Sequence, residues 1–368
     1  MIIDFLPFQW QVILSFIAAF AICYMMIPPI IRLARDKKFV ALPDERTSHE
    51  FPIPTIGGIA IYLAFILSSL LFGGITNAPI LPYITASTLI IFIVGLKDDV
   101  YQTSPKVKLL GEFAAILVAV ILADIRITNF QGVFGIYEVS YSVSVGFSIL
   151  VFVGVTNAIN LMDGIDGLAA SLGIVACIGF GIFFWTTKRY GEAISCASLI
   201  GALAAFLRFN YASSEKKIFM GDTGSLIIGF IIACLAIRFN EINIHVPLKL
   251  KVHASPVISV AILAIPIFDT LRVMIFRIIK RKSPFKPDKS HIHHVLLTKG
   301  YSHHNATILI STFSFLLIVF MYSIQYKVTG NTLLFILIAI VAIFYVLPFT
   351  FYFNQIKSLF RRKENLNK

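Results

Sequence analysis

Long apolar runs recur along almost the whole chain, and they constrain its fold more than any other feature. Many of them approach the length of about 20 residues that an α-helix needs to cross the hydrocarbon core of a bilayer. Of the 368 residues, 58% are hydrophobic and only 14% are charged, whereas soluble domains carry about 25% charged residues. The sequence therefore predicts an all-α, polytopic integral membrane protein in which residues 1–368 form a single transmembrane domain.

These runs predict about eleven transmembrane helices. Their approximate bounds are 8–34, 54–73, 79–96, 107–124, 142–160, 167–187, 192–209, 221–238, 254–276, 307–325 and 331–354. The first run has no Lys or Arg before it and no small-residue cleavage motif, which indicates an uncleaved helix and not a signal peptide. Pro28 and Pro29 are expected to bend or end this helix before Arg32.

The distribution of basic residues predicts how the helices are oriented. If the N-terminus lies outside and the C-terminus in the cytoplasm, the cytoplasmic segments contain 24 of the 31 Lys and Arg residues. Such an excess is typical of cytoplasmic loops, so we expect a multi-pass protein of the inner (plasma) membrane. A net charge of +12 favours anionic lipid headgroups or phosphorylated substrates as partners. Nucleic acid is a poor alternative, because the sequence has no soluble basic domain.

Unusual polar clusters fall on the predicted cytoplasmic side. They lie in the loops 43–58, 95–112, 157–167, 208–225 and 277–306. Ionisable residues within or at the edge of membrane spans are costly and usually functional. We therefore expect one shared active site at the cytoplasmic ends of the helices.

The loop 95–112 has the sequence GLKDDVYQTSPKVKLLGE. Asp98 and Asp99 directly follow an apolar run, and adjacent carboxylates suit binding a divalent cation or accepting a proton, since like charges raise one pKa. A solvated pair of acids is the alternative interpretation. Lys108 could contact a phosphate as a point charge, whereas Lys106 is expected to anchor the loop at the membrane surface.

Two further segments, NAINLMDGIDG and FMGDTGS, combine polar side chains with glycines. Asn157, Asn160 and Asp163 are three residues apart and face broadly one way on a helix. Their amide and carboxylate oxygens are hard ligands that suit Mg²⁺, although the spacing is not that of a calcium loop. Asp222 lies between glycines that allow close approach of a ligand. The alternative for this second segment is a simple cap of the following helix, made by Asp222, Thr223 and Ser225.

The loop 277–306 carries five of the eight histidines, His291, His293, His294, His303 and His304. Neither a Cys nor a spaced set of carboxylates completes a zinc site. The neighbouring lysines Lys286, Lys289 and Lys299 would attract phosphate instead. The first three histidines are therefore expected to donate to a diphosphate, whereas His303 and His304 are expected to begin the next helix.

Four motifs occur in order along the chain: GLKDD followed by SPKVKLLGE, NAINLMDGIDG, MGDTGS, and PDKSHIHHVLLTKGYSHHNA. Together they resemble the polyprenyl-phosphate N-acetylhexosamine-1-phosphate transferases, which are glycosyltransferases of family 4. The resemblance covers about Pro43 to Ala306. It implies transfer of a sugar 1-phosphate from a UDP-N-acetylhexosamine to a membrane polyprenyl phosphate, with release of UMP. Phosphoryl transfer depends mainly on positioning and charge neutralisation, which suits a site rich in Lys, His and metal ligands.

The resemblance also implies roles for individual residues. Mg²⁺, with Mn²⁺ as a substitute, would be held by Asn160 and Asp222. Asp98 or Asp99 would deprotonate or orient the lipid phosphate, and Asp163 with Asp166 would line the uridine pocket. The expected catalytic residues are Asp98, Asp99, Asp222, His293 and His294. The expected substrate-binding residues are Lys108, Asn160, Asp163, Asp166, His291 and Thr55.

Within this family, the HIHH segment is more similar to the bacterial undecaprenyl-phosphate GlcNAc-1-phosphate transferases, which begin lipid-linked cell-surface polysaccharides such as O-antigen. The peptidoglycan branch has three adjacent histidines, and Ile292 interrupts them here. Gln102 stands where some members have an acid, which weakens the case for a second metal at Asp98 and Asp99. The sequence is compatible with a homodimer. It leaves open the sugar, the polymer pathway, and whether attack is direct or passes through a covalent intermediate.

A transporter of anionic or lipid-linked substrates is the main alternative from another class. Transporters place ionisable residues near the middle of the membrane, in discontinuous helices related by internal repeats. This chain has no such repeat, and its ionisable residues lie at predicted helix ends. A membrane metalloprotease is a weaker alternative, because the sequence contains no HExxH motif.

Overall fold

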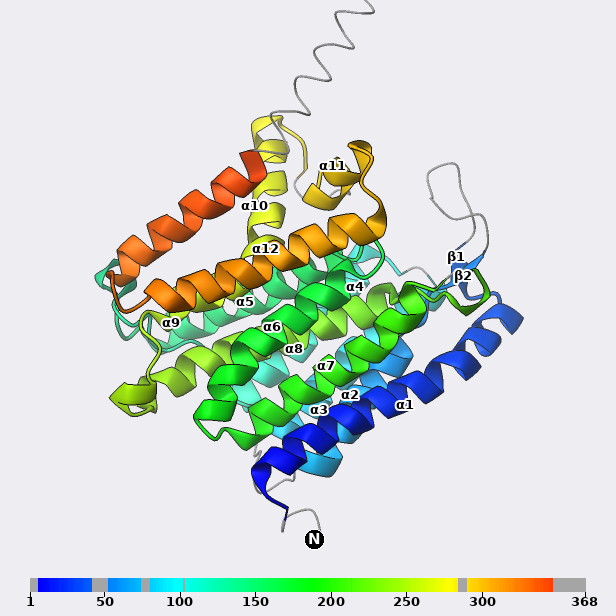
Figure 1. Ribbon diagram of the computed structural model, residues 1–368, viewed down its shortest axis with the longest axis horizontal. Helices are drawn as coiled ribbons and strands as arrows, with labels where there is room; N and C mark the ends of the chain where they lie inside the picture. Colours follow the sequence, from blue (N-terminus) through cyan, green and yellow to red (C-terminus); the bar gives the residue numbers. More distant parts are fainter. Residues whose placement is uncertain are drawn as a thin grey trace, which may run out of the picture.

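The computed structural model describes residues 6–41, 52–73, 80–101, 103–212, 214–283 and 290–346, and they form a helical bundle (Figure 1). Some positions considered above lie outside the described residues. These are the loop residues 43–51, Gln102, Lys286, Lys289 and the end of the last expected span, 347–354. The described part of the chain confirms an all-α membrane protein.

Within the described residues, seven helices are long and apolar enough to cross a membrane. They are α1 (Phe8–Asp36), α3 (Leu81–Tyr101), α5 (Tyr141–Leu161), α6 (Leu168–Thr186), α7 (Tyr190–Asn210), α8 (Gly221–His245) and α12 (His303–Ile324). The segments Leu248–Ile262 and Ala264–Ile279 meet at 58° and would add one broken span. The helices Gly58–Gly73 and Gly330–Val346 are apolar but shorter. The expected count of eleven spans and the orientation of the termini remain predictions.

Shorter elements complete the described fold. They are β1 (Val40–Ala41), β2 (Ile53–Pro54), α2 (Gly58–Gly73), α4 (Pro105–Leu117), η2 (Val118–Leu122), η3 (Val133–Gly135), η4 (Ser214–Lys216), η5 (Leu248–Leu250), α9 (Ser255–Ile262), α10 (Ala264–Ile279) and α11 (Ile292–Thr298). The two strands pair antiparallel, with Val40 opposite Pro54. This pairing brings the segment after α1 next to the start of α2.

Helix α8 lies at the centre of the bundle and is the most buried of the seven candidate spans (Figure 1). Glycines let its neighbours approach its N-terminal half closely. A Cβ added to Gly95 of α3 would lie 2.6 Å from Thr223 Cα, and one added to Gly229 would lie 2.7 Å from Thr156 Cα on α5. Because α3 and α5 touch α8 through backbone, the polar motifs on these three helices are held together.

The first helix differs from the expectation for its prolines. Helix α1 runs without a break from Phe8 to Asp36 and contains both Pro28 and Pro29. Of the two effects expected of the prolines, an end of the helix before Arg32 does not occur, and a bend stays a prediction. Buried contacts on both sides of the prolines, made by Ile27 and Ile30 against the core, offset the hydrogen bonds that the prolines cannot donate.

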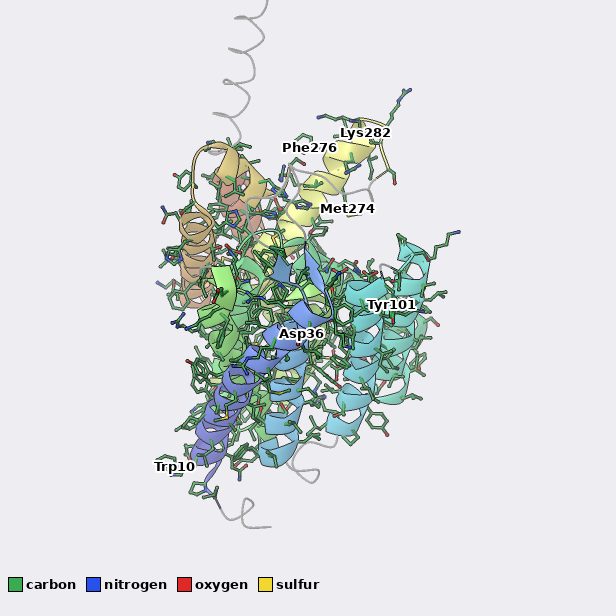
Figure 2. All side chains as sticks on the ribbon, turned by 90° about the vertical axis from the view of Figure 1, so that its right-hand side faces the viewer. Trp10, Asp36, Tyr101, Met274, Phe276 and Lys282 are labelled. Carbon is green, nitrogen blue, oxygen red and sulfur yellow. The ribbon has the colours of Figure 1, made fainter. Side chains whose placement is uncertain are left out.

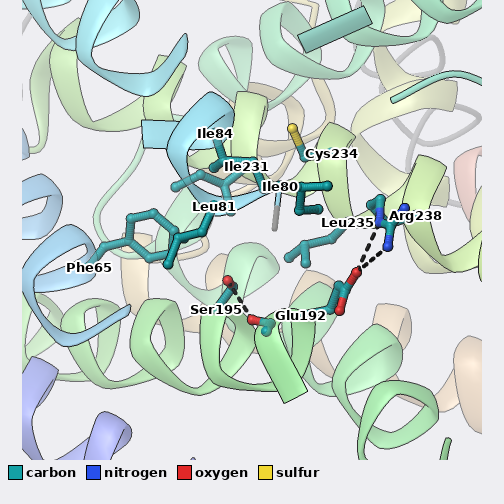
Figure 3. A pocket seen from close by; sticks show the side chains of 11 residues that line it. Phe65, Ile80, Leu81, Ile84, Glu192, Ser195, Ile231, Cys234, Leu235 and Arg238 are labelled. Carbon is teal, nitrogen blue, oxygen red and sulfur yellow. Dashed lines mark hydrogen bonds and ion pairs between the residues drawn. The ribbon is translucent and has the colours of Figure 1, made fainter. Parts of the chain in front are cut away.

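An ion pair lies in the half of the bundle that is remote from these motifs. Arg238 of α8 donates from Nε and Nη2 to Glu192 Oε1 of α7, at 2.9 and 2.6 Å (Figure 3). Phe65, Leu81 and Cys234 line a small pocket beside the pair. A charge in apolar surroundings is costly unless it is paired, so the two side chains stabilise each other and join α7 to α8.

Helix α10 projects from the bundle, and Met274, Phe276 and Lys282 mark this projecting region in Figure 2. Ile275 and Ile279 are more than half exposed, whereas Asp269 and Arg277 are buried. The helix is therefore amphipathic, with an apolar face directed outward, as expected of a helix that contacts lipid.

We predict that Gly95→Ala destabilises the protein, because the new methyl group would overlap the backbone at Thr223. Overpacking of this kind costs about 1–3 kcal/mol. The thermal unfolding midpoint in detergent measures the effect. Gly154→Ala is the matched control, since a Cβ there meets nothing within 4 Å. Equal midpoints for the two variants would contradict close packing of α3 on α8.

Candidate active site

The N-terminus of α8 receives its cap from α3. The Asp99 carboxylate accepts hydrogen bonds from the backbone N–H groups of Asp222, at 2.7 Å, and Thr223, at 3.0 Å, and from the Thr223 hydroxyl. The first N–H groups of a helix have no partner within it, and the helix dipole favours a carboxylate there. The alternative in which Asp222 caps its own helix is therefore wrong, and its side chain is available for another role.

The Asp222 carboxylate joins α8 to two other helices. It accepts hydrogen bonds from Lys108 Nζ of α4 and from Asn160 Nδ2 of α5, both at 2.7 Å. Asn160 also donates to the Ser225 hydroxyl at 2.8 Å. The structure thus brings together residues from three of the four motifs, as the sequence analysis predicted.

Lys108 connects Asp222 to Asp98. Its Nζ atom lies 3.3 Å from Asp98 Oδ2, while Asp98 Oδ1 accepts from the backbone N–H and the hydroxyl of Thr103, each at 2.7 Å. Asp98 therefore fixes the turn between α3 and α4 with one oxygen and faces Lys108 with the other. The two adjacent aspartates, equivalent in the sequence, have different partners.

A second pair of polar residues lies behind this cluster. Asn157 Nδ2 donates to Glu112 Oε2 at 2.9 Å, and Glu112 is only 2% exposed. Asn157 thereby links α5 to α4. Glu112 has no role predicted from the motifs, although an acid inside an apolar run must find a partner when it is buried.

Asp163 lies in the turn after α5 and differs from the other acids. No hydrogen bond to its carboxylate is present among the described residues. Burial and the neighbouring charges of Asp222 and Asp99 raise the pKa of Asp163 well above its ordinary value. Excess negative charge therefore gathers at this point, and a cation or a proton would stabilise it.

Asp166, in the same turn, is ion-paired. Its Oδ2 atom lies 2.6 Å from Lys217 Nζ and 3.2 Å from His303 Nδ1. Burial alone would raise the pKa of Asp166, but the hydrogen bonds from His303 and Lys217 outweigh it and lower the pKa. His303 begins α12 as predicted. Its contact with Asp166 and the role of Lys217 were not foreseen.

Asp269 holds the first histidine of the HIHH segment. His291 Nδ1 lies 2.7 Å from Asp269 Oδ2, and the Ile292 N–H donates to Asp269 Oδ1 at 3.1 Å. Arg272 donates to the same carboxylate at 2.8 Å and to the Ser290 carbonyl. Asp269 is fully buried. Asp269 and Arg272 were not predicted as site residues, because they lie about twenty positions before the histidines, inside an expected span.

His293 packs against the turn that contains Asp163. A Cβ added to Gly164 would collide with His293 Nε2, so any larger residue there would displace the His293 ring. Burial, together with the neighbouring His294, lowers the pKa of His293 to about 3, and the ring is therefore neutral at neutral pH. The ring centroids of His293 and His294 are 4.3 Å apart. The histidine segment thus lies beside the acid-rich turn.

Thr55 lies at the edge of the acid cluster. Gly221 has φ +70°, and a Cβ at this position would collide with the Thr55 carbonyl oxygen and crowd the Asp99 carboxylate. The Thr55 backbone therefore packs on the start of α8, next to Asp222. The described end of the first loop thus lies beside the acid cluster, and the substrate-binding role expected of Thr55 stays a prediction.

Comparison with known proteins identifies the class of protein to which these features belong. A model of glycosyl transferase family 4 matches residues 81–240, which include Asp98, Asp163 and Asp222. A probable undecaprenyl-phosphate N-acetylglucosaminyl 1-phosphate transferase of Bacillus subtilis (strain 168) is 31% identical over 310 residues, which cover 83% of each chain. The chain therefore belongs to glycosyl transferase family 4.

Two further relatives have similar names. The undecaprenyl-phosphate alpha-N-acetylglucosaminyl 1-phosphate transferase of Escherichia coli (strain K12) is 30% identical, over 76% of this chain and 75% of that protein. The protein of the same name from Yersinia pestis is 28% identical, over 95% of this chain and 92% of its own length. The likeness thus extends well beyond the central motifs.

We predict that Asp269→Asn lowers transfer activity by about tenfold or more, because His291 loses the charge that orients it. The prediction is tested with Asp269→Asn, His291→Gln and the double variant, by measuring kcat, KM and thermal unfolding. If Asp269 acts through His291, the double variant is no slower than His291→Gln. Additive losses in kcat would contradict this role.

Proposed function

We propose that this protein transfers N-acetylglucosamine 1-phosphate from UDP-N-acetylglucosamine to undecaprenyl phosphate, releases UMP and begins a lipid-linked cell-surface polysaccharide. The observation that carries the proposal is the Lys108 ammonium between Asp98 and Asp222 at the start of α8. A cation held among carboxylates at a helix N-terminus is suited to a diphosphate and its metal ion. The names of the relatives support the acceptor and the sugar.

Mg²⁺ fits the donor groups at this point. Asn160 and Asp222 would hold the ion. The nearby Asp163 carboxylate accepts no hydrogen bond among the described residues, and a bound cation would stabilise its charged form. The described residues contain no cluster of three His, Cys, Asp or Glu side chains that could hold a metal by themselves. Mg²⁺ commonly takes one or two protein ligands and completes its shell with water and substrate phosphates, and Mn²⁺ accepts the same ligands. When bound, the ion would neutralise charge on the diphosphate.

The different partners of the two aspartates suggest different roles. Both Asp99 oxygens accept from the start of α8, so Asp99 positions Asp222. Asp98 Oδ2 faces Lys108 and is proposed to accept the proton of the lipid phosphate or to orient it for attack. Lys108 would then move from the carboxylates to the diphosphate of the donor.

The remaining motif residues are proposed to bind the donor. Asp163 and Asp166 would line the uridine pocket, with Lys217 and His303 holding Asp166 in place. His291, His293 and His294 would contribute contacts to phosphate or sugar. A neutral His293 would act as a hydrogen-bonding group and not as a positive charge.

The membrane setting follows the same proposal. The site would face the cytoplasm, where the UDP-sugar is made, with the N-terminus outside and the C-terminus inside. The prenyl chain of the acceptor would remain in the bilayer while its phosphate reaches the helix ends. An apolar lipid tail and a polar donor can meet only at such an interface.

The direct test uses purified protein with UDP-N-acetylglucosamine, undecaprenyl phosphate and Mg²⁺. We expect equal amounts of UMP and lipid-linked product, loss of both on metal chelation, and recovery with Mg²⁺ or Mn²⁺. Asp222→Asn should abolish turnover while the protein still inserts, whereas Asp36→Asn, at an exposed position on α1, should remain active. Lack of product with any UDP-N-acetylhexosamine, where the E. coli relative is active, would refute the proposal.

We also predict that Asp98→Asn and Asp99→Asn fail in different ways. Asp99→Asn removes the negative charge and one of the two acceptor oxygens at the start of α8, and should lower the thermal midpoint as well as turnover, since such a charge contributes about 0.3–2 kcal/mol. Asp98→Asn should remove turnover with a smaller change in midpoint. The two midpoints, measured in the same detergent, decide between the assignments. If Asp98→Asn lowered the thermal midpoint more than Asp99→Asn, the two roles would have to be exchanged.

A further inference from the structure

A second polar site lies at the opposite end of the bundle from the acid cluster. Helix α8 starts at Gly221 beside Asp99 and has 25 residues, which at about 1.5 Å per residue span roughly 37 Å. Its far end therefore lies near the opposite membrane surface. There a cavity of about 320 Å³ is lined by residues that include Asn129, Gln131, Tyr137, Lys251, His253 and Tyr326. We call it the far-end cavity.

The walls of the far-end cavity are fixed by buried hydrogen bonds. Asn243, which is fully buried, exchanges two hydrogen bonds of 2.8 Å with the backbone of Val252 and donates to Gln131 Oε1 at 2.9 Å. Gln131 donates in turn to the Asn240 carbonyl at 2.9 Å. Since buried amides are costly unless they are satisfied, this network gives the cavity a defined shape before any ligand arrives.

Two residues that line the far-end cavity have left-handed backbone conformations. Gln131 has φ +52° and Ala254 has φ +50°, which is uncommon for residues other than glycine. Such conformations persist only where surrounding contacts enforce them, and they gather at ligand sites. Here the Asn243 network holds both segments.

The charge of the far-end cavity favours an anion. Lys251 and His253 are among its lining residues, whereas none of the described lining residues is Asp or Glu. The nearby Glu241 carboxylate already accepts from the Thr128 N–H and hydroxyl, at 2.8 and 2.7 Å. The side chains of Lys251, His253, Asn129 and Tyr137 carry the kinds of donor that phosphate oxygens require. Tyr326 donates its hydroxyl to the Lys251 carbonyl at 2.6 Å.

The rim of the far-end cavity favours an anion that carries lipid chains. Leu248 is 87% exposed, Tyr326 67% and Tyr137 64%. Aromatic residues with a polar tip are typical of the headgroup level of a bilayer. We propose that the far-end cavity binds the phosphate of an anionic phospholipid from the leaflet opposite the candidate active site. This inference is independent of the transfer reaction.

The experiment compares lipid binding by variants at the far-end cavity. Lys251→Gln, His253→Gln and the double variant are reconstituted with phosphatidylglycerol or phosphatidylcholine. Retained lipid is measured by native mass spectrometry, and the thermal midpoint in each lipid is measured separately. Lys249→Gln is the matched control, since Lys249 is exposed, lies two positions from Lys251 and does not line the cavity. His253 is exposed as well, so its single variant is expected to fold.

We expect wild type and Lys249→Gln to retain phosphatidylglycerol selectively. Their thermal midpoints should be higher in this lipid than in phosphatidylcholine. The double variant should bind this lipid at least tenfold more weakly, with an intermediate loss in each single variant. Equal loss in Lys249→Gln would show a general effect of surface charge and overturn the proposal. Equal binding of both lipids would also overturn it, as would inorganic phosphate alone raising the midpoint as much as the lipid.

Discussion

The hydrogen bonds from the start of α8 to Asp99 are the interaction on which the rest of the site depends. Helix α8 is the most buried candidate span, so its first N–H groups must find an acceptor inside the protein. Asp99 provides that acceptor from α3. Because the cap comes from another helix, Asp222 projects toward Lys108 and Asn160. One contact thus fixes both the packing of two helices and the direction of the key carboxylate.

An excess of negative charge follows from this arrangement. Asp98 and Asp222 share the Lys108 ammonium, and Asp163 lies beside them with a raised pKa and no hydrogen bond among the described residues. Helix packing holds these acids close together, so a bound cation, or a cation with phosphate, would relieve the repulsion between them. In the proposed reaction, binding of the metal and the donor would relieve the repulsion between these carboxylates. This relief would contribute to the affinity for both.

Much of the candidate site could be predicted, because the motif residues do converge. The separate roles of these residues could not be predicted from the sequence. Asp98 and Asp99 are neighbours in sequence, yet their roles depend on Thr103 and on the start of α8, 123 positions away. His291 and His293 likewise differ only through Asp269 and Gly164. Partners distant in the chain decide these assignments, and no local pattern marks them.

The sequence by itself determined that this is an all-α membrane protein, because apolar length and charge spacing are local properties that a bilayer selects directly. It also determined the family, through four short motifs. Only the tertiary structure decided that α1 continues through Pro28 and Pro29, that Glu112 pairs with Asn157, and that a polar cavity lies at the far end of α8. Each of these depends on packing between distant segments, where the stabilising contact outweighs the local preference of the chain.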